Sequence, residues 1–147
     1  MSGRFFLDTN VFVYAFDQNA PQKSKAALAL IRRALDTGQG VISYQVAQEF
    51  VNVAVRRFEH PFSIPECEQY FLTVLKPLLA IHSSPVLYLE GLRIMGRHRI
   101  GWYDSLIVAG ALESQCATLY SEDMQSGREI DGLRIENPFI PSVESRG

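Results

Sequence analysis

The sequence has few cysteines, no long apolar run and no excess of positive charge, and each absence narrows what the chain can be. Its two cysteines, Cys67 and Cys116, lie far apart and match no metal-ligand spacing, so we expect two free thiols. No apolar stretch approaches the roughly 20 residues that span a bilayer, and the N-terminus lacks the features of a signal peptide. We therefore expect a cytoplasmic protein without membrane association.

The charge balance also argues against binding of nucleic acid through overall charge. The formal net charge is -2 and the pI is about 5.9, whereas a basic surface is the usual electrostatic footprint of a nucleic-acid-binding protein. Carboxylates that hold cations would change this balance, because two bound divalent ions would make the sum positive. Net charge therefore lowers the expectation of nucleic-acid binding without excluding it.

The length and the apolar content predict one domain. The chain has 147 residues, of which 47% are hydrophobic, enough for a single core. Short apolar strands that alternate with amphipathic helices predict an α/β fold with a mostly parallel sheet. We place this domain at residues 1–139 and expect a flexible tail, rich in Pro and Ser, at 140–147. The expected strands are 5–7, 41–42, 117–120 and 133–135, and the expected helices are 11–16, 22–36, 44–58, 63–76, 84–99 and 102–114.

Two carboxylates directly follow predicted strands. Asp8 comes after the apolar run 5–7, and Asp123 follows the strand 117–120 after Ser121 and Glu122. In open parallel sheets, ligands bind in the crevice outside the carboxyl ends of the strands. The alternative for Asp8 is a helix cap, because Asp is a preferred residue at that position.

Two more carboxylates lie on predicted helices. Glu49 borders the apolar stripe of the helix 44–58, and Asp104 lies in the first turn of a helix, on the face that carries the apolar residues. For Glu49 the alternative is a salt bridge with Arg56 or Arg57, and for Asp104 it is capping. Right-handed crossovers bring strand ends and helix starts to one edge of the sheet, so all four acids can meet there.

Such a cluster of acids predicts a metal site. Crowded carboxylates raise one another's pKa and repel unless a cation neutralises them. Oxygen ligands without Cys or His suit Mg²⁺ or Mn²⁺, and such ions commonly bridge carboxylates and substrate phosphates. The expected reaction is hydrolysis of a phosphodiester by water, with the ions lowering the pKa of that water and stabilising the leaving oxygen. The histidines His60, His82 and His98 have no evident triad partners, which agrees with a water nucleophile.

A basic run closes the helix 84–99. It contains Arg93, Arg97 and Arg99, with His98 between the last two. These side chains either contact substrate phosphates or form a solvated face that is favourable at a helix C-terminus, and the sequence supports both readings equally.

Four segments resemble the conserved segments of the PIN-domain family, especially of VapC-like toxins. They are Leu7-Asp8-Thr9-Asn10, residues 43–50 (SYQVAQEF), Tyr103-Asp104-Ser105-Leu106-Ile107 and Ser121-Glu122-Asp123-Met124. The resemblance covers residues 4–139 in family order and spacing. It implies a three-layer α/β/α sandwich and a Mg²⁺-dependent endoribonuclease, the toxin of a toxin–antitoxin pair.

The resemblance also implies a role for each matching residue. Asp8, Glu49 and Asp104 correspond to the three central acids of the family, and Asp123 to its more variable fourth acid. Three further residues have implied or open roles: Asn10 and Ser121 match polar residues that hold the first and last acids, whereas Glu122 either faces solvent or replaces Asp123 as a ligand. A toxin of this kind would cleave RNA, form a homodimer and be blocked by an antitoxin whose segment enters the acidic groove.

Three other functions compete with a toxin. A phosphotransferase of the haloacid dehalogenase type requires a second Asp two residues after the first, where this chain has Asn10. A non-catalytic, Mg²⁺-binding receiver-like module requires a late Lys, and the last Lys here is Lys76. A housekeeping PIN nuclease in RNA processing remains an alternative, which the neighbouring gene would distinguish from a toxin.

Overall fold

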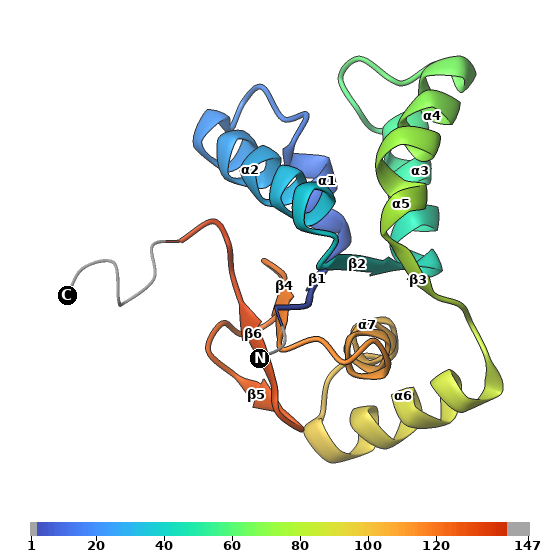
Figure 1. The fold of residues 1–147 in the computed structure, drawn as a ribbon, viewed down its shortest axis with the longest axis vertical. Helices are drawn as coiled ribbons and strands as arrows, with labels where there is room; N and C mark the ends of the chain where they lie inside the picture. The colour runs from blue at the N-terminus through green and yellow to red at the C-terminus, as the bar shows by residue number, and fades with distance from the viewer. Residues whose placement is uncertain (1–2, 141–147) are drawn as a thin grey trace.

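The computed structural model describes residues 3–140, which form a six-stranded sheet with helices on both faces (Figure 1). The strand order is β3-β2-β1-β4-β6-β5, and neighbouring strands are parallel except for the β5–β6 pair. The strands are β1 (Phe5–Leu7), β2 (Gly40–Ser43), β3 (Leu79–Ile81), β4 (Thr118–Tyr120), β5 (Glu129–Ile130) and β6 (Leu133–Glu136).

The helices form two layers, one on each side of this sheet. In Figure 1 the helices α1 to α5 lie above the strands, and α6 and α7 lie below them. The predicted α/β/α sandwich with a mostly parallel sheet is therefore confirmed. The helices are α1 (Thr9–Tyr14), α2 (Pro21–Thr37), α3 (Tyr44–Arg56), α4 (Ile64–Tyr70), the π-helical turn η1 (Phe71–Leu75), α5 (Lys76–Leu78), α6 (Pro85–His98) and α7 (Trp102–Glu113).

Serine side chains start three of these helices. Ser43, Ser63 and Ser84 are the N-caps of α3, α4 and α6, and each hydroxyl accepts a hydrogen bond from a backbone N–H of the first turn. At Ser63 the side chain of Glu66 returns the bond and completes a capping box. These polar residues fix where helices begin, which is why the sequence predicted their starts.

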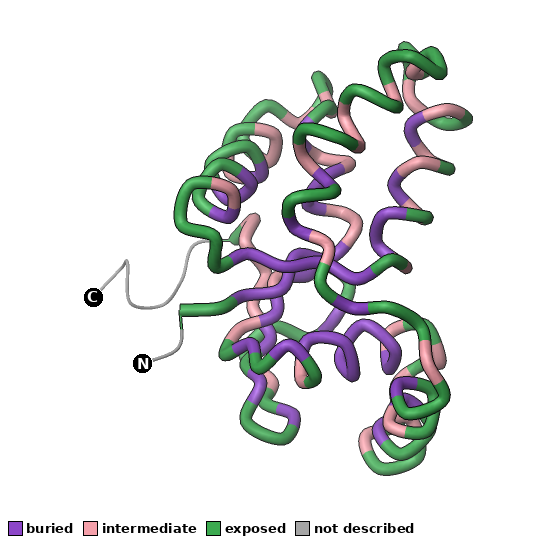
Figure 2. Tube along the Cα trace, turned by 45° about the vertical axis from the view of Figure 1, so that its right-hand side comes forward, coloured by how far each residue is buried: buried purple, intermediate pink, exposed green. Residues whose placement is uncertain are grey.

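The core lies on both faces of the central strands. The three residues of β1 are buried, and so is every residue of α7 from Ser105 to Ala111, because α7 lies between the sheet and α6 (Figure 2). Such a helix is apolar all round rather than on one stripe. The first turn of α7 is thereby held at the sheet edge where β1 ends.

The structure adds two strands that the sequence did not predict. β3 has only three residues and follows directly after α5, and β5 has only two. The helical segment predicted to stop at Lys76 continues past Pro77 to Leu78. No helix within residues 3–140 is long and apolar enough to span a membrane. Apart from Ile140, the predicted tail 140–147 lies outside the described residues.

Candidate active site

Asp8 is placed by the pairing of the two central strands. Leu7 is opposite Tyr120 in the parallel β1–β4 pair, and the Asp8 N–H donates to the Tyr120 carbonyl at 3.0 Å. The Asp8 carboxylate is buried and accepts two bonds, one from the Thr9 N–H at 2.7 Å and one from the Ser121 hydroxyl at 2.8 Å. Asp8 is therefore the N-cap of α1, and the charges of two other predicted acids act on it, so capping does not exclude the predicted role in the site.

Burial changes the ionisation of this carboxyl. Desolvation is the largest cause that raises the pKa of Asp8 to about 7, and the negative charges of Glu49 and Asp123 raise it further. The bonds from Ser121 and Thr9 act in the opposite direction. A buried acid whose charged form is disfavoured by neighbouring acids marks a place where a cation would be stabilised.

Glu49 reaches the same edge from α3. Its carboxylate accepts a hydrogen bond from the Thr9 hydroxyl at 2.6 Å and another from the Gln45 side-chain amide at 3.3 Å. Within residues 3–140 no ion pair joins Glu49 to Arg56 or Arg57, so the alternative of a salt bridge is wrong for this structure. Thr9, which lies between two predicted site residues in the sequence, links Glu49 to the end of β1.

Asp104 enters from the opposite layer, in the first turn of α7. The helix is capped by Gly101 without any side-chain bond, so Asp104 is not the cap. Burial raises the pKa of this half-buried carboxyl first, and the charges of Asp123 and Glu49 raise it further. The positive end of the α7 dipole partly offsets this cost of holding a charge.

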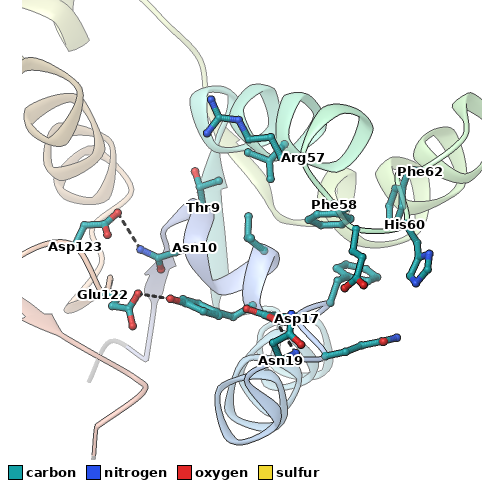
Figure 3. A pocket seen from close by; sticks show the side chains of 16 residues that line it. Thr9, Asn10, Asp17, Asn19, Arg57, Phe58, His60, Phe62, Glu122 and Asp123 are labelled. Carbon is teal, nitrogen blue, oxygen red and sulfur yellow. Dashed lines mark hydrogen bonds between the residues drawn. The ribbon is translucent and has the colours of Figure 1, made fainter.

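Asp123 is the most exposed of the four acids, and two predicted supporting residues hold it. The Asn10 amide donates to its carboxylate at 3.1 Å (Figure 3), and its own N–H donates to the Ser121 hydroxyl at 3.3 Å. Because the same hydroxyl donates to Asp8, Ser121 joins the first and last acids. The buried Oδ1 of Asn10 has no partner among the described residues.

Glu122 points away from the acid cluster. The Tyr14 hydroxyl donates to its carboxylate at 2.8 Å (Figure 3), and the Lys23 ammonium forms an ion pair with it at 2.5 Å. Glu122 thus neither faces solvent alone nor takes the place of Asp123. This pairing was not predictable from the sequence, because Lys23 and Tyr14 reach Glu122 from two other elements, α2 and α1.

The donor set fits a hard divalent cation in charge and chemistry. Four carboxylates supply oxygen only, their charges act on one another, and an unpartnered amide oxygen lies beside them. Within the described residues, no three His, Cys, Asp or Glu side chains lie close enough together to hold one ion in this conformation. The four acids are those predicted, namely Asp8, Glu49, Asp104 and Asp123.

The arginines predicted to contact substrate line neither of the two hollows that Asp123 borders. The guanidinium of Arg93 is shared between Glu90 and Asp131, at 2.7 and 2.6 Å, while Arg97 and Arg99 are exposed. Arg128 is a cation that the sequence did not suggest. It lines a hollow of about 170 Å³ together with Asp104 and Asp123.

Asp123 also lines a larger hollow of about 760 Å³ (Figure 3). Thr9, Asn10 and Asp123 line the end of the hollow at the acids. Most of the other lining side chains belong to the α1–α2 loop and the α3–α4 loop, and α1, α3 and Glu122 supply the remainder. Asp123 borders both hollows, and Asp104 borders the smaller one.

Comparisons with known proteins agree with this architecture. The family model described as PIN domain matches residues 5–128. Similar solved structures include a toxin–antitoxin complex from Klebsiella pneumoniae (18% identity, TM-score 0.63, covering 90% of this chain and 96% of that one). Others are VapBC2 from Rickettsia felis bound to a promoter DNA fragment (21%, 0.60, 90% and 97%) and the sarcin–ricin loop cleaving toxin VapC20 from Mycobacterium tuberculosis (15%, 0.57, 81% and 89%). No curated protein is a significant match to the sequence.

Proposed function

Because the chain belongs to the PIN domain family, we propose that it is a metal-dependent endoribonuclease and the toxin of a toxin–antitoxin pair. The observation that supports the proposal is that the charges of Glu49 and Asp123 act on the carboxyls of both Asp8 and Asp104. Each of the acids with a raised pKa owes part of that rise to other members of the cluster. Four mutually repelling carboxylates are costly to fold together, which favours a function that needs them.

In this proposal the four acids hold Mg²⁺ or Mn²⁺, which would supply Lewis-acid activation of a water and of the phosphodiester. The other residues keep the ligands in place. Ser121 orients Asp8 and the Asp123 backbone through one hydroxyl, Asn10 orients the Asp123 side chain, and Thr9 orients Glu49. Partners of this kind typically change activity by 10- to 100-fold when removed.

Two features of the relatives support RNA as the substrate and an antitoxin as the partner. One similar structure is described as a toxin that cleaves the sarcin–ricin loop, and another is described as a toxin–antitoxin complex. We propose that this chain likewise cleaves RNA, acts in the cytoplasm, forms a homodimer and is inhibited by an antitoxin. A role as a housekeeping nuclease differs only in the absence of that antitoxin.

Purified protein tests the nuclease proposal directly. We expect cleavage of single-stranded RNA with Mg²⁺ or Mn²⁺ and none in EDTA. Asp8→Asn or Asp104→Asn should lower kcat by at least about 100-fold while circular dichroism remains unchanged. Asp36→Asn, an exposed acid at the end of α2, is the matched control and should cleave as the wild type does. Full cleavage in EDTA, or by either site variant, contradicts the proposal.

Expression in bacteria tests the toxin assignment separately. We expect growth arrest that depends on Asp104 and is relieved when the neighbouring open reading frame is co-expressed. Normal growth together with full RNA cleavage in vitro would support the housekeeping alternative.

A further inference from the structure

The larger hollow continues from the acid cluster into an aromatic recess. Phe16 of the α1–α2 loop and Phe58 and Phe62 of the α3–α4 loop line it beyond Thr9 and Asn10. The Phe16 ring lies 5.4 Å from that of Phe58 and 5.2 Å from that of Phe62, between centroids, and 38% of Phe16 is exposed. The three rings therefore pack together, and the exposed part of Phe16 is accessible to a ligand.

Arg57 is placed between this recess and the acids. It is the C-cap of α3, and its side chain is exposed and lines the hollow. Figure 3 shows its guanidinium pointing toward the part of the hollow near Thr9 rather than toward His60. Within residues 3–140 the guanidinium makes no hydrogen bond or ion pair, in contrast to Arg93, which two carboxylates occupy. Arg57 is therefore a cation available to a ligand.

The charges of the hollow decide which ligand fits best. Asp17 and Glu59 also line the hollow, and Figure 3 shows Asp17 beside Asn19, apart from Arg57. A phosphate is favoured only beside Arg57, and an uncharged, flat group is favoured against the rings. A nucleotide has this division of charge, with a charged phosphate and an uncharged, flat base. The volume of the hollow, about 760 Å³, also lies within the range of roughly 300–1,000 Å³ that is usual for small-molecule sites.

We propose that this hollow binds one unpaired nucleotide of the RNA substrate next to the cleaved bond. The base stacks on the exposed face of Phe16 beside Phe58, and the phosphate that follows the scissile one pairs with Arg57. The inference rests on the proposed function and adds a substrate requirement to it. The RNA must be single-stranded at this nucleotide, because a paired base cannot turn into the recess.

Matched arginine variants test the phosphate contact. Arg56 and Arg57 are neighbours at the end of α3, both exposed, and only Arg57 lines the hollow. Arg57→Gln should raise KM for a short oligoribonucleotide by about tenfold with kcat nearly unchanged, and should lower the slope of log affinity against log salt by about 0.7. Arg56→Gln should change neither quantity. Equal effects of the two variants, or no effect of Arg57→Gln, overturn this contact.

An oligoribonucleotide with one missing base tests the recess. Affinity is measured in the Asp8→Asn background, so that cleavage does not interfere. Moving the abasic site along the RNA should reveal one position, beside the cleaved bond, where affinity falls by about tenfold. Phe16→Leu should lower the affinity of the intact RNA similarly and should remove the difference at that position. Tyr88→Leu, which alters an exposed aromatic residue of α6, should leave the difference intact.

The outcomes separate this inference from the proposed function. If the wild type fails to cleave any RNA with Mg²⁺ or Mn²⁺, the proposed function fails. If it cleaves RNA but every abasic position is equivalent, only the recess is overturned. If Arg57→Gln and Phe16→Leu weaken inhibition by a co-expressed antitoxin and leave RNA affinity unchanged, the hollow is a protein-binding surface and the inference is wrong.

Discussion

Two buried serines differ in the hydrogen bonds that their hydroxyls make. The Ser121 hydroxyl donates to Asp8 and accepts from the Asp123 N–H, whereas the Ser105 hydroxyl has no partner among the described residues. Both side chains are fully buried. We expect Ser121→Ala to reduce kcat/KM at neutral pH by about tenfold, because the Asp8 carboxylate loses a donor that favours its charged form.

The pH profile identifies the cause of that loss. Since the bond from Ser121 lowers the pKa of Asp8, its removal should move the rising limb of kcat/KM to higher pH. Ser105→Ala is the control and should leave both the profile and the free energy of unfolding nearly unchanged, because it removes a hydroxyl that has no bond to lose. An unshifted profile in Ser121→Ala contradicts this role.

The ionisation of Asp8 should also be visible in the stability of the metal-free protein. Its pKa is about 7 in the folded chain against an ordinary value of 3.8, so between these values the folded state keeps a proton that the unfolded state has lost. The free energy of unfolding should therefore fall as pH rises from about 4 to about 7, by up to about 4 kcal/mol. Urea titrations in EDTA at a series of pH values measure this slope.

Two changes should remove the slope. Asp8→Asn deletes the titrating group, and added Mg²⁺ favours the charged form that burial disfavours. Asp36→Asn should keep the slope, because this acid is exposed at the end of α2. A stability that rises with pH in the metal-free wild type would show that Asp8 is not the dominant titrating group.

Two glycines show how closely the helical layers approach the sheet. A Cβ built on Gly40 would lie 2.1 Å from the Cβ of Ala34, so α2 packs on β2 only because Gly40 has no side chain. A Cβ on Gly110 would meet its nearest neighbour, Phe6, at 3.6 Å, which is an ordinary contact. We expect Gly40→Ala to reduce the free energy of unfolding by about 3 kcal/mol through overpacking.

Gly110→Ala should have the opposite effect. This glycine lies inside α7 with room for a methyl group, so the substitution should stabilise the protein by about 0.5–1 kcal/mol through helix propensity. Chemical denaturation of both variants measures the difference. Equal effects of the two substitutions would contradict the packing described for the α2–β2 contact.

The two glycines between α2 and β2 show which element boundaries could be predicted from the sequence and which could not. The helix predicted over residues 22–36 ends at Thr37, and Gly38 caps it in a left-handed conformation. Gly40, in contrast, opens β2 at a close approach that only the fold creates. The strands that lead to Asp8 and Asp123 were predictable because apolar runs end there in polar residues. The three-residue β3 after Pro77 was not predictable, because it pairs with β2 only once the intervening helices have packed.

The candidate site, too, was predictable from the sequence only in part. The convergence of four acids follows from parallel topology, which the alternation of strands and helices predicts. The partners that hold them do not follow, because Thr9 meets Glu49 forty positions away and Lys23 meets Glu122 across ninety-nine. Contacts of that kind depend on the angle and the register of packed helices rather than on local pattern.

For the whole molecule, the distribution of exposed apolar side chains bears on the proposed homodimer. Val86, Leu89 and Leu92 are spaced three apart on α6 and are exposed by 71%, 66% and 49%, and Tyr88 on the same helix is exposed by 45%. Apolar side chains gathered on one helix are characteristic of an interface rather than of a solvated surface. A twofold dimer would place the α6 helices of the two chains against each other.

If the proposed homodimer forms through α6, Leu89→Asp should convert it to a monomer. The charge would lie at the centre of an apolar contact and, by symmetry, opposite its own copy, so each dimer would bear two uncompensated charges. Light scattering at micromolar concentration measures the mass. Leu72→Asp, which changes a 55% exposed leucine on the opposite helical layer, is the matched control and should leave the mass unchanged. If Leu89→Asp stays dimeric and Leu72→Asp does not, the interface lies on the layer of α1 to α5 instead.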